Sequence, residues 1–225
     1  MPRRNRVTPF GTLEATTARG AFMGNRGDLH GADGAIRRDA RPDVVRRICC
    51  TLAEGPAGPV RFDTPGRYTP LFFTDEAVAL AAGHRPCARC RRPAFERFVA
   101  AWRRAHGIDD DAAIRADEID RALDAARRRA ETGEYRRAAV ADLPDGVFVV
   151  RDGASEVPYL VVAGRLHRWR WQGYDPAVTP EAEETVGLLS PAPLIAVLRA
   201  GYRPEMPTFD SRAAGRGRRR GRPGP

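Results

Sequence analysis

Two cysteines that lie two residues apart, Cys87 and Cys90, constrain the fold of this chain more than any other feature of its sequence. Two thiolates at this spacing bind one Zn²⁺ when the backbone between them makes a tight turn. A helix is expected to follow at once, because Pro93 suits a first helical turn and apolar residues then recur with the period of a helix. The spacing therefore predicts a metal-binding turn that leads into a helix. A redox-active or purely structural thiol pair is the alternative use of the same spacing.

A tetrahedral zinc site needs two further ligands, and the remaining thiol and imidazole donors are two other cysteines and four histidines. Adjacent residues of a strand point to opposite faces, so only one of Cys49 and Cys50 is expected to reach the ion. Cys50 has the same parity as most apolar residues of the expected strand 44–52, so we predict Cys50 as the third ligand. His30, in a glycine-flanked loop, is the predicted fourth ligand. His84 is closer in sequence but would have to fold back over the turn.

Residues 73–91 combine an alanine-rich helix with the sequence Gly-His-Arg-Pro-Cys-Ala-Arg-Cys-Arg. This segment resembles the zinc-binding, DNA-contacting N-terminal module of the Ada methylphosphotriester repair family, whose helix is followed by Gly-Phe-Arg-Pro-Cys-x-x-Cys. The resemblance implies that Cys87 and Cys90 are the second pair of zinc ligands of such a module. We expect the arginines beside them to contact DNA, namely Arg85, Arg89 and Arg91.

The same family carries a first pair of cysteines after a Gly-x-Phe sequence, and the first of these thiols accepts a methyl group. In this chain Met23 and Gly27 stand at the corresponding positions. A thioether is already alkylated and glycine has no side chain, so methyl-acceptor chemistry is not expected. The whole-chain pattern also resembles a group of bacterial proteins that share the cysteine turn, and this second resemblance implies no activity.

The distribution of charge indicates where nucleic acid would bind. All 38 basic residues are arginines, which excludes P-loop kinases and Schiff-base enzymes because both need a lysine amine. The net charge is +9, yet residues 211–225 hold six arginines and no acid, and residues 1–6 hold three arginines and no acid. The chain between these ends is formally neutral. Non-specific attraction for phosphate is therefore expected mainly at the two ends.

These observations predict a zinc-binding protein whose partner is DNA, contacted mostly through phosphates. Residues 220–223 read Arg-Gly-Arg-Pro, the core of a minor-groove AT-hook. The predicted contacts in the tail are Arg218, Arg219, Arg220 and Arg222. A metal-dependent hydrolase or nuclease with an open zinc position, and a zinc-stabilised module that binds another protein, are the alternatives. The sequence identifies no catalytic residue.

The order of expected elements predicts an α+β fold, because strands and helices segregate more than they alternate. We expect an Ada-like zinc module at 1–106, a helical linker at 107–134, a β-rich domain with a C-terminal helix at 135–210 and a disordered Arg/Gly/Pro-rich tail at 211–225. Asp152-Gly153 predicts a hairpin in the third part. No apolar run is long enough to span a membrane and no apolar stretch follows the first arginines, so we expect a cytoplasmic protein without a membrane partner.

Overall fold

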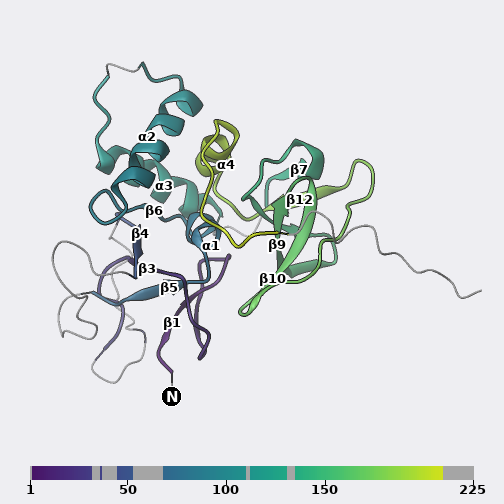
Figure 1. Cartoon of the computed structure of the whole chain (residues 1–225), viewed down its shortest axis with the longest axis horizontal. Coiled ribbons are helices and arrows are strands. Elements are labelled where there is room, and N and C mark those ends of the chain that lie inside the picture. The colour runs from purple at the N-terminus through teal and green to yellow at the C-terminus, as the bar shows by residue number, and fades with distance from the viewer. Residues whose placement is uncertain are drawn as a thin grey trace, which may run out of the picture.

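The computed structural model describes residues 2–31, 36, 45–52, 68–109, 112–130 and 135–209 (Figure 1). Within these residues the fold is α+β and consists mostly of sheet, with two six-stranded sheets and four α-helices. The α+β prediction is therefore confirmed. The predicted tail contacts Arg218, Arg219, Arg220 and Arg222 lie outside the described residues.

The first sheet is built from residues 4–86 and has the order β2-β1-β5-β3-β4-β6. Most neighbours are antiparallel, but β1 pairs with β5 and β4 pairs with β6 in parallel. The six strands are β1 (Arg4–Val7), β2 (Leu13–Ala15), β3 (Phe22–Asn25), β4 (Ile48–Thr51), β5 (Leu71–Phe73) and β6 (Arg85–Pro86). Because β6 lies beside β4 at the edge of the sheet, the turn that follows β6 lies next to the cysteines of β4.

Local sequence explains where the helices begin and end. Helix α1 (Glu76–Ala81) begins after Asp75, whose carboxylate accepts a hydrogen bond of 3.0 Å from the Val78 N–H. Helix α2 (Arg92–His106) has a proline in its first turn and ends at a glycine in the left-handed conformation. The predicted helix over this segment is therefore confirmed. The other two helices are α3 (Ala116–Ala130) and α4 (Ala192–Arg199).

The second sheet is antiparallel and has the order β11-β10-β9-β8-β12-β7. Its strands are β7 (Arg137–Ala139), β8 (Phe148–Arg151), β9 (Ala154–Val162), β10 (Arg165–Arg170), β11 (Gly173–Tyr174) and β12 (Thr185–Leu188), and a short 3₁₀ helix (Val140–Asp142) follows β7. Strands β8 and β9 are joined at Asp152-Gly153, where the φ angle of Gly153 is 70°. This is the hairpin that the sequence predicted.

Both hydrophobic cores join the N-terminal half of the chain to the second sheet, and one of them joins the two sheets directly. One cluster of buried side chains joins Leu80 and Phe98 to Val149 and Val161, and a second joins residues of β5 and α1 to residues of β8 and β9. Helix α3 also belongs to the first cluster, because Ile119 is fully buried. The segment predicted to be a linker thus contributes to the core, and the boundaries expected near residues 106 and 135 do not separate two cores. No helix among the described residues is both long enough and apolar enough to cross a membrane.

Candidate metal centre

Three cysteine side chains from two segments of the chain converge at the edge of the first sheet. The Sγ atoms of Cys50, Cys87 and Cys90 all lie within 4.8 Å of one another. Cys50 belongs to β4, Cys87 follows β6 directly, and Cys90 ends the turn that leads into α2. The structure therefore brings together three of the four predicted ligands, in a group that can hold a metal ion.

Backbone pairing between β4 and β6 sets the positions of these thiols. In the parallel register Cys49 lies opposite Pro86, and the Cys87 N–H donates a hydrogen bond of 2.9 Å to the Cys49 carbonyl. The Arg91 N–H then donates a hydrogen bond of 3.1 Å to the Cys87 carbonyl, which closes the turn over Ala88 to Cys90. The tight turn expected from the Cys-x-x-Cys spacing is thus held by main-chain hydrogen bonds on both sides.

The three thiols shift one another's pKa values, because they share hydrogen bonds. Hydrogen bonds from the thiols of Cys50 and Cys90 lower the pKa of Cys87, and the backbone N–H groups of Cys90 and Arg89 lower it further. The hydrogen bond to Cys87 raises the pKa of Cys50. The pKa of Cys90 is also raised, because the lowering effect of its bond with Cys50 is outweighed by its bond with Cys87 and by burial. The group without a metal ion therefore favours one thiolate and two thiols. A bound divalent cation would favour the thiolate form of all three cysteines.

The neighbouring thiol of Cys49 lies on the opposite face of β4, as the alternation of a strand requires. Its side chain is fully buried in the core, and burial raises its pKa well above the ordinary value. Its Sγ accepts a hydrogen bond of 3.4 Å from Nη1 of Arg91. Cys50, the predicted third ligand, is thus the cysteine of β4 that lies in the group. Its face of the strand is not the apolar one, because Ile48 is half-buried and Leu52 is 42% exposed.

The predicted fourth ligand, His30, is not in the group. Its Nδ1 lies 3.0 Å from the Thr69 hydroxyl and its Nε2 lies 3.1 Å from the Arg4 carbonyl. All cysteines and histidines of the sequence fall within the described residues, and among them only the three cysteines gather. In this arrangement a fourth ligand would come from a donor other than a cysteine or histidine side chain, such as a carboxylate, water or an external molecule.

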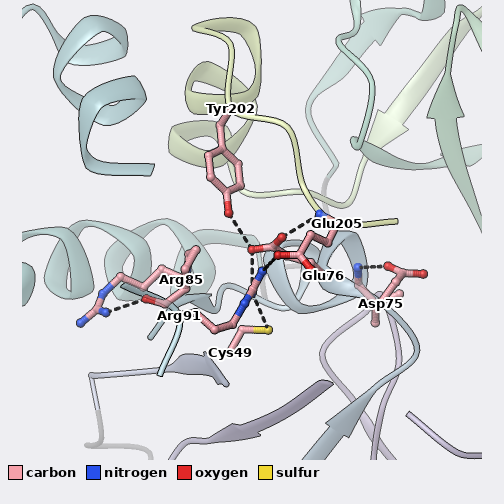
Figure 2. Close-up of polar contacts among 9 residues, drawn as sticks. Cys49, Asp75, Glu76, Arg85, Arg91, Tyr202 and Glu205 are labelled. Atoms are coloured by element: carbon pink, nitrogen blue, oxygen red, sulfur yellow. Dashed lines mark hydrogen bonds and ion pairs between the residues drawn. The ribbon is translucent and has the colours of Figure 1, made fainter. Parts of the chain in front are cut away.

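Arg91, one of the predicted DNA contacts, lies in the interior beside this centre (Figure 2). Its Nη1 donates to Oε1 of Glu76 at 2.8 Å, and its Nη2 donates to Glu205 at 2.6 Å. Burial lowers the pKa of Arg91, but the ion pair with Glu76 outweighs burial and raises it overall. The guanidinium is 5% exposed, so the structure assigns Arg91 to an internal ion pair in place of the expected phosphate contact.

Glu76 is the centre of this network, and sequence reasoning missed it. Its Oε1 also accepts a hydrogen bond of 2.7 Å from the Tyr202 hydroxyl, and its Oε2 accepts one of 2.7 Å from the Glu205 N–H. Figure 2 shows Glu76 between Arg91 and the C-terminal segment. The sequence signal for this buried network was a single acid in a short, otherwise apolar helix. All six residues of α1 are buried in the structure. A fully buried carboxylate requires partners of this kind.

Arg85 is likewise internal. Its guanidinium forms two hydrogen bonds of 2.8 Å to the carboxylate of Asp120 in α3, and the two side chains are 3% and 5% exposed. It also lies over the ring of Phe95, at 5.1 Å from the centroid. This placement corrects the expectation that Arg85 contacts DNA. Arg89, the third of the predicted arginines, is exposed in the cysteine turn.

The chemistry that the centre supports is binding of a thiophilic metal ion by three thiolates, one from β4 and two from the turn after β6. No known protein family, curated protein or solved structure matches the chain.

Proposed function

We propose that this chain is a zinc-binding protein in which Cys50, Cys87 and Cys90 hold one ion. The observation that supports the proposal is the convergence of three Sγ atoms within 4.8 Å from separate segments of the chain. Thiolates are ligands that Zn²⁺ prefers, and a Cys-x-x-Cys turn before a helix is a common source of two of them. The Ada-like segment 73–91 supports the same assignment.

The bound ion would stabilise the fold by joining β4 of the first sheet to the turn that leads into α2. Arg91 follows immediately after the last ligand and carries the buried network of Glu76 and Glu205. A metal ion that fixes Cys90 therefore also fixes the residue on which α1 and the C-terminal segment depend. Because the ligands come together only in the folded chain, the free energy of metal binding would contribute to folding.

Zinc content of the full-length protein and X-ray absorption at the zinc edge test this proposal. We expect about one ion per chain, as in other single structural sites, with three sulfur ligands and one lighter ligand. Cys50→Ser should lose most of the zinc and lower the melting temperature. Cys49→Ser is the matched control, because it changes the same residue type one position away and should keep the metal. Absence of zinc from the wild type, or equal loss from both variants, would refute the assignment.

DNA is the partner we propose, and the charge distribution supports it. Six arginines without an acid lie in residues 211–225 and three more lie in residues 1–6, while the chain between them is formally neutral. Arg89 is exposed at the cysteine turn and offers a further cation beside the metal centre. Arginines of this kind bind phosphates without reading sequence, so affinity should be strongly salt-dependent.

Fluorescence anisotropy with an arbitrary duplex across a salt series tests this partner. Replacing the six tail arginines by glutamine should weaken binding and reduce the salt slope by up to about 0.9 for each DNA phosphate that the tail no longer neutralises. Arg92→Gln and Arg121→Gln, both on exposed helical surface, are controls that remove cations outside the tail. Negligible binding by the unmodified protein near physiological salt would reject DNA and favour the hydrolase or protein-binding alternatives.

A further inference from the structure

Three basic residues lie in one row across the first sheet, at the ends of β3, β4 and β6. The β3–β4 pairing includes Asn25 opposite Ile48, so the next pair in register is Arg26 and Arg47. The β4–β6 pairing places Ile48 opposite Arg85, so Arg47 is also next to His84. The Arg85 N–H donates a hydrogen bond of 3.1 Å to the Arg47 carbonyl, which fixes this register. The three strands lie side by side in Figure 1.

A fourth basic side chain reaches the row from α3. Arg127 packs against Gly83, since a Cβ placed on this glycine would lie 3.1 Å from the Arg127 Cδ. Arg127 also pairs with Asp124 of its own helix, and Nη1 of Arg26 donates a hydrogen bond of 3.2 Å to the Gly11 carbonyl. Three guanidinium groups from separate parts of the chain thus lie near enough to act on the charge of His84.

His84 adds a hydrogen-bond acceptor to this group of three arginines. The residue is fully buried, and its Nδ1 lies 3.2 Å from the Ala82 carbonyl. A carbonyl can only accept, so Nδ1 carries the proton and Nε2 of the neutral ring carries a lone pair. Nε2 is buried and has no hydrogen-bond partner among the described residues. The ring is held in place by an edge contact with Phe73, at 4.8 Å between centroids.

The electrostatic surroundings keep this acceptor in its neutral form. Burial lowers the pKa of His84 well below its ordinary value, and the charges of Arg47, Arg26 and Arg127 lower it further. The group therefore combines several cationic donors with one acceptor that does not become a donor at neutral pH. A buried acceptor of this kind gains most from a ligand that brings its own proton.

We infer that Arg26, Arg47, Arg127 and His84 form a binding site for inorganic phosphate or a singly charged phosphate monoester. Phosphate oxygens accept hydrogen bonds from the guanidinium groups, which match them in charge and geometry. The remaining P–O–H group donates to Nε2 of His84. Sulfate and phosphodiesters have no such proton at neutral pH, so the same site rejects them. None of its four residues is a proposed metal ligand or a proposed DNA contact.

Isothermal titration of the full-length protein at pH 7 and constant ionic strength tests the site, with inorganic phosphate and sulfate as probes. Phosphate should bind at one site. The affinity for sulfate should be at least about tenfold lower, because a sulfate oxygen beside Nε2 would place two hydrogen-bond acceptors against each other. Adenosine monophosphate at pH 6, where about half of it keeps the P–O–H group, is the third probe: binding identifies a monoester ligand, and its exclusion identifies free phosphate. Equal affinities for phosphate and sulfate in the wild type would overturn the inference.

Substitutions locate the site. Arg47→Gln should weaken phosphate binding about tenfold, since it removes a charged donor, and Arg92→Gln should leave it unchanged because Arg92 is 76% exposed on α2. His84→Gln supplies an amide that can donate as well as accept, so the preference for phosphate over sulfate should largely disappear. If this variant does not fold, the wild-type selectivity and the Arg47→Gln comparison decide the question. Unchanged phosphate binding in Arg47→Gln would refute the site.

Discussion

His84 should make the stability of the protein depend on pH. Its pKa is well below the ordinary value of 6.5 in the folded state, mainly because of burial, whereas the unfolded chain takes up a proton near that value. As the pH falls below 6.5, the unfolded state therefore binds more protons, and the free energy of unfolding should fall by about 1.4 kcal/mol per pH unit through this residue. Urea unfolding of wild type and His84→Gln at several pH values from mildly acidic to neutral measures the difference. Parallel pH profiles would show that the pKa of His84 is the same in the folded and unfolded states.

Helices α1 and α2 and the C-terminal segment depend on one another through Glu76. This carboxylate accepts hydrogen bonds from Arg91, Tyr202 and the Glu205 N–H, and it is fully buried. Glu76→Gln should cost about 2 kcal/mol or more, because an amide N–H₂ then faces buried donors. Glu96→Gln is the matched control, since its pair with Arg92 is exposed and should cost less than about 0.5 kcal/mol. Denaturant unfolding distinguishes the two, and equal costs would mean that the network contributes little to stability.

The molecule as a whole should unfold in one cooperative step, because both hydrophobic cores join the N-terminal half of the chain to the second sheet. Trp102 of α2 belongs to the same cluster as Leu198 of α4, and the Trp169 Nε1–H donates a hydrogen bond of 3.0 Å to the Thr74 hydroxyl before α1. In each variant that retains only Trp102 or only Trp169, the midpoint of unfolding from fluorescence should therefore equal the midpoint from circular dichroism. A fragment of residues 1–106 should lack stable structure by circular dichroism. Two separate midpoints would instead support the module boundaries that the sequence predicted.

The sequence by itself determined the features that depend on neighbouring residues. Pro93 and Gly107 delimit α2, and Asp152-Gly153 sets the β8–β9 hairpin, because backbone dihedral preferences and capping act over a few residues. The spacing of Cys87 and Cys90 likewise specified their turn. The parity of a strand showed that Cys49 and Cys50 point to opposite faces.

Only the tertiary structure decided which of these faces meets the other cysteines and which arginines reach solvent. Cys50 faces Cys87 because β4 and β6 pair in parallel, and no local pattern specifies that pairing. Arg85 and Arg91 resemble surface cations in the sequence, yet their partners Asp120 and Glu205 lie far along the chain. His30 was predicted as a ligand from the composition of its loop, but its ring lies beside Thr69 and Arg4. The physical reason is the same in each case: burial and charge pairing depend on distance in space, which a single sequence does not encode locally.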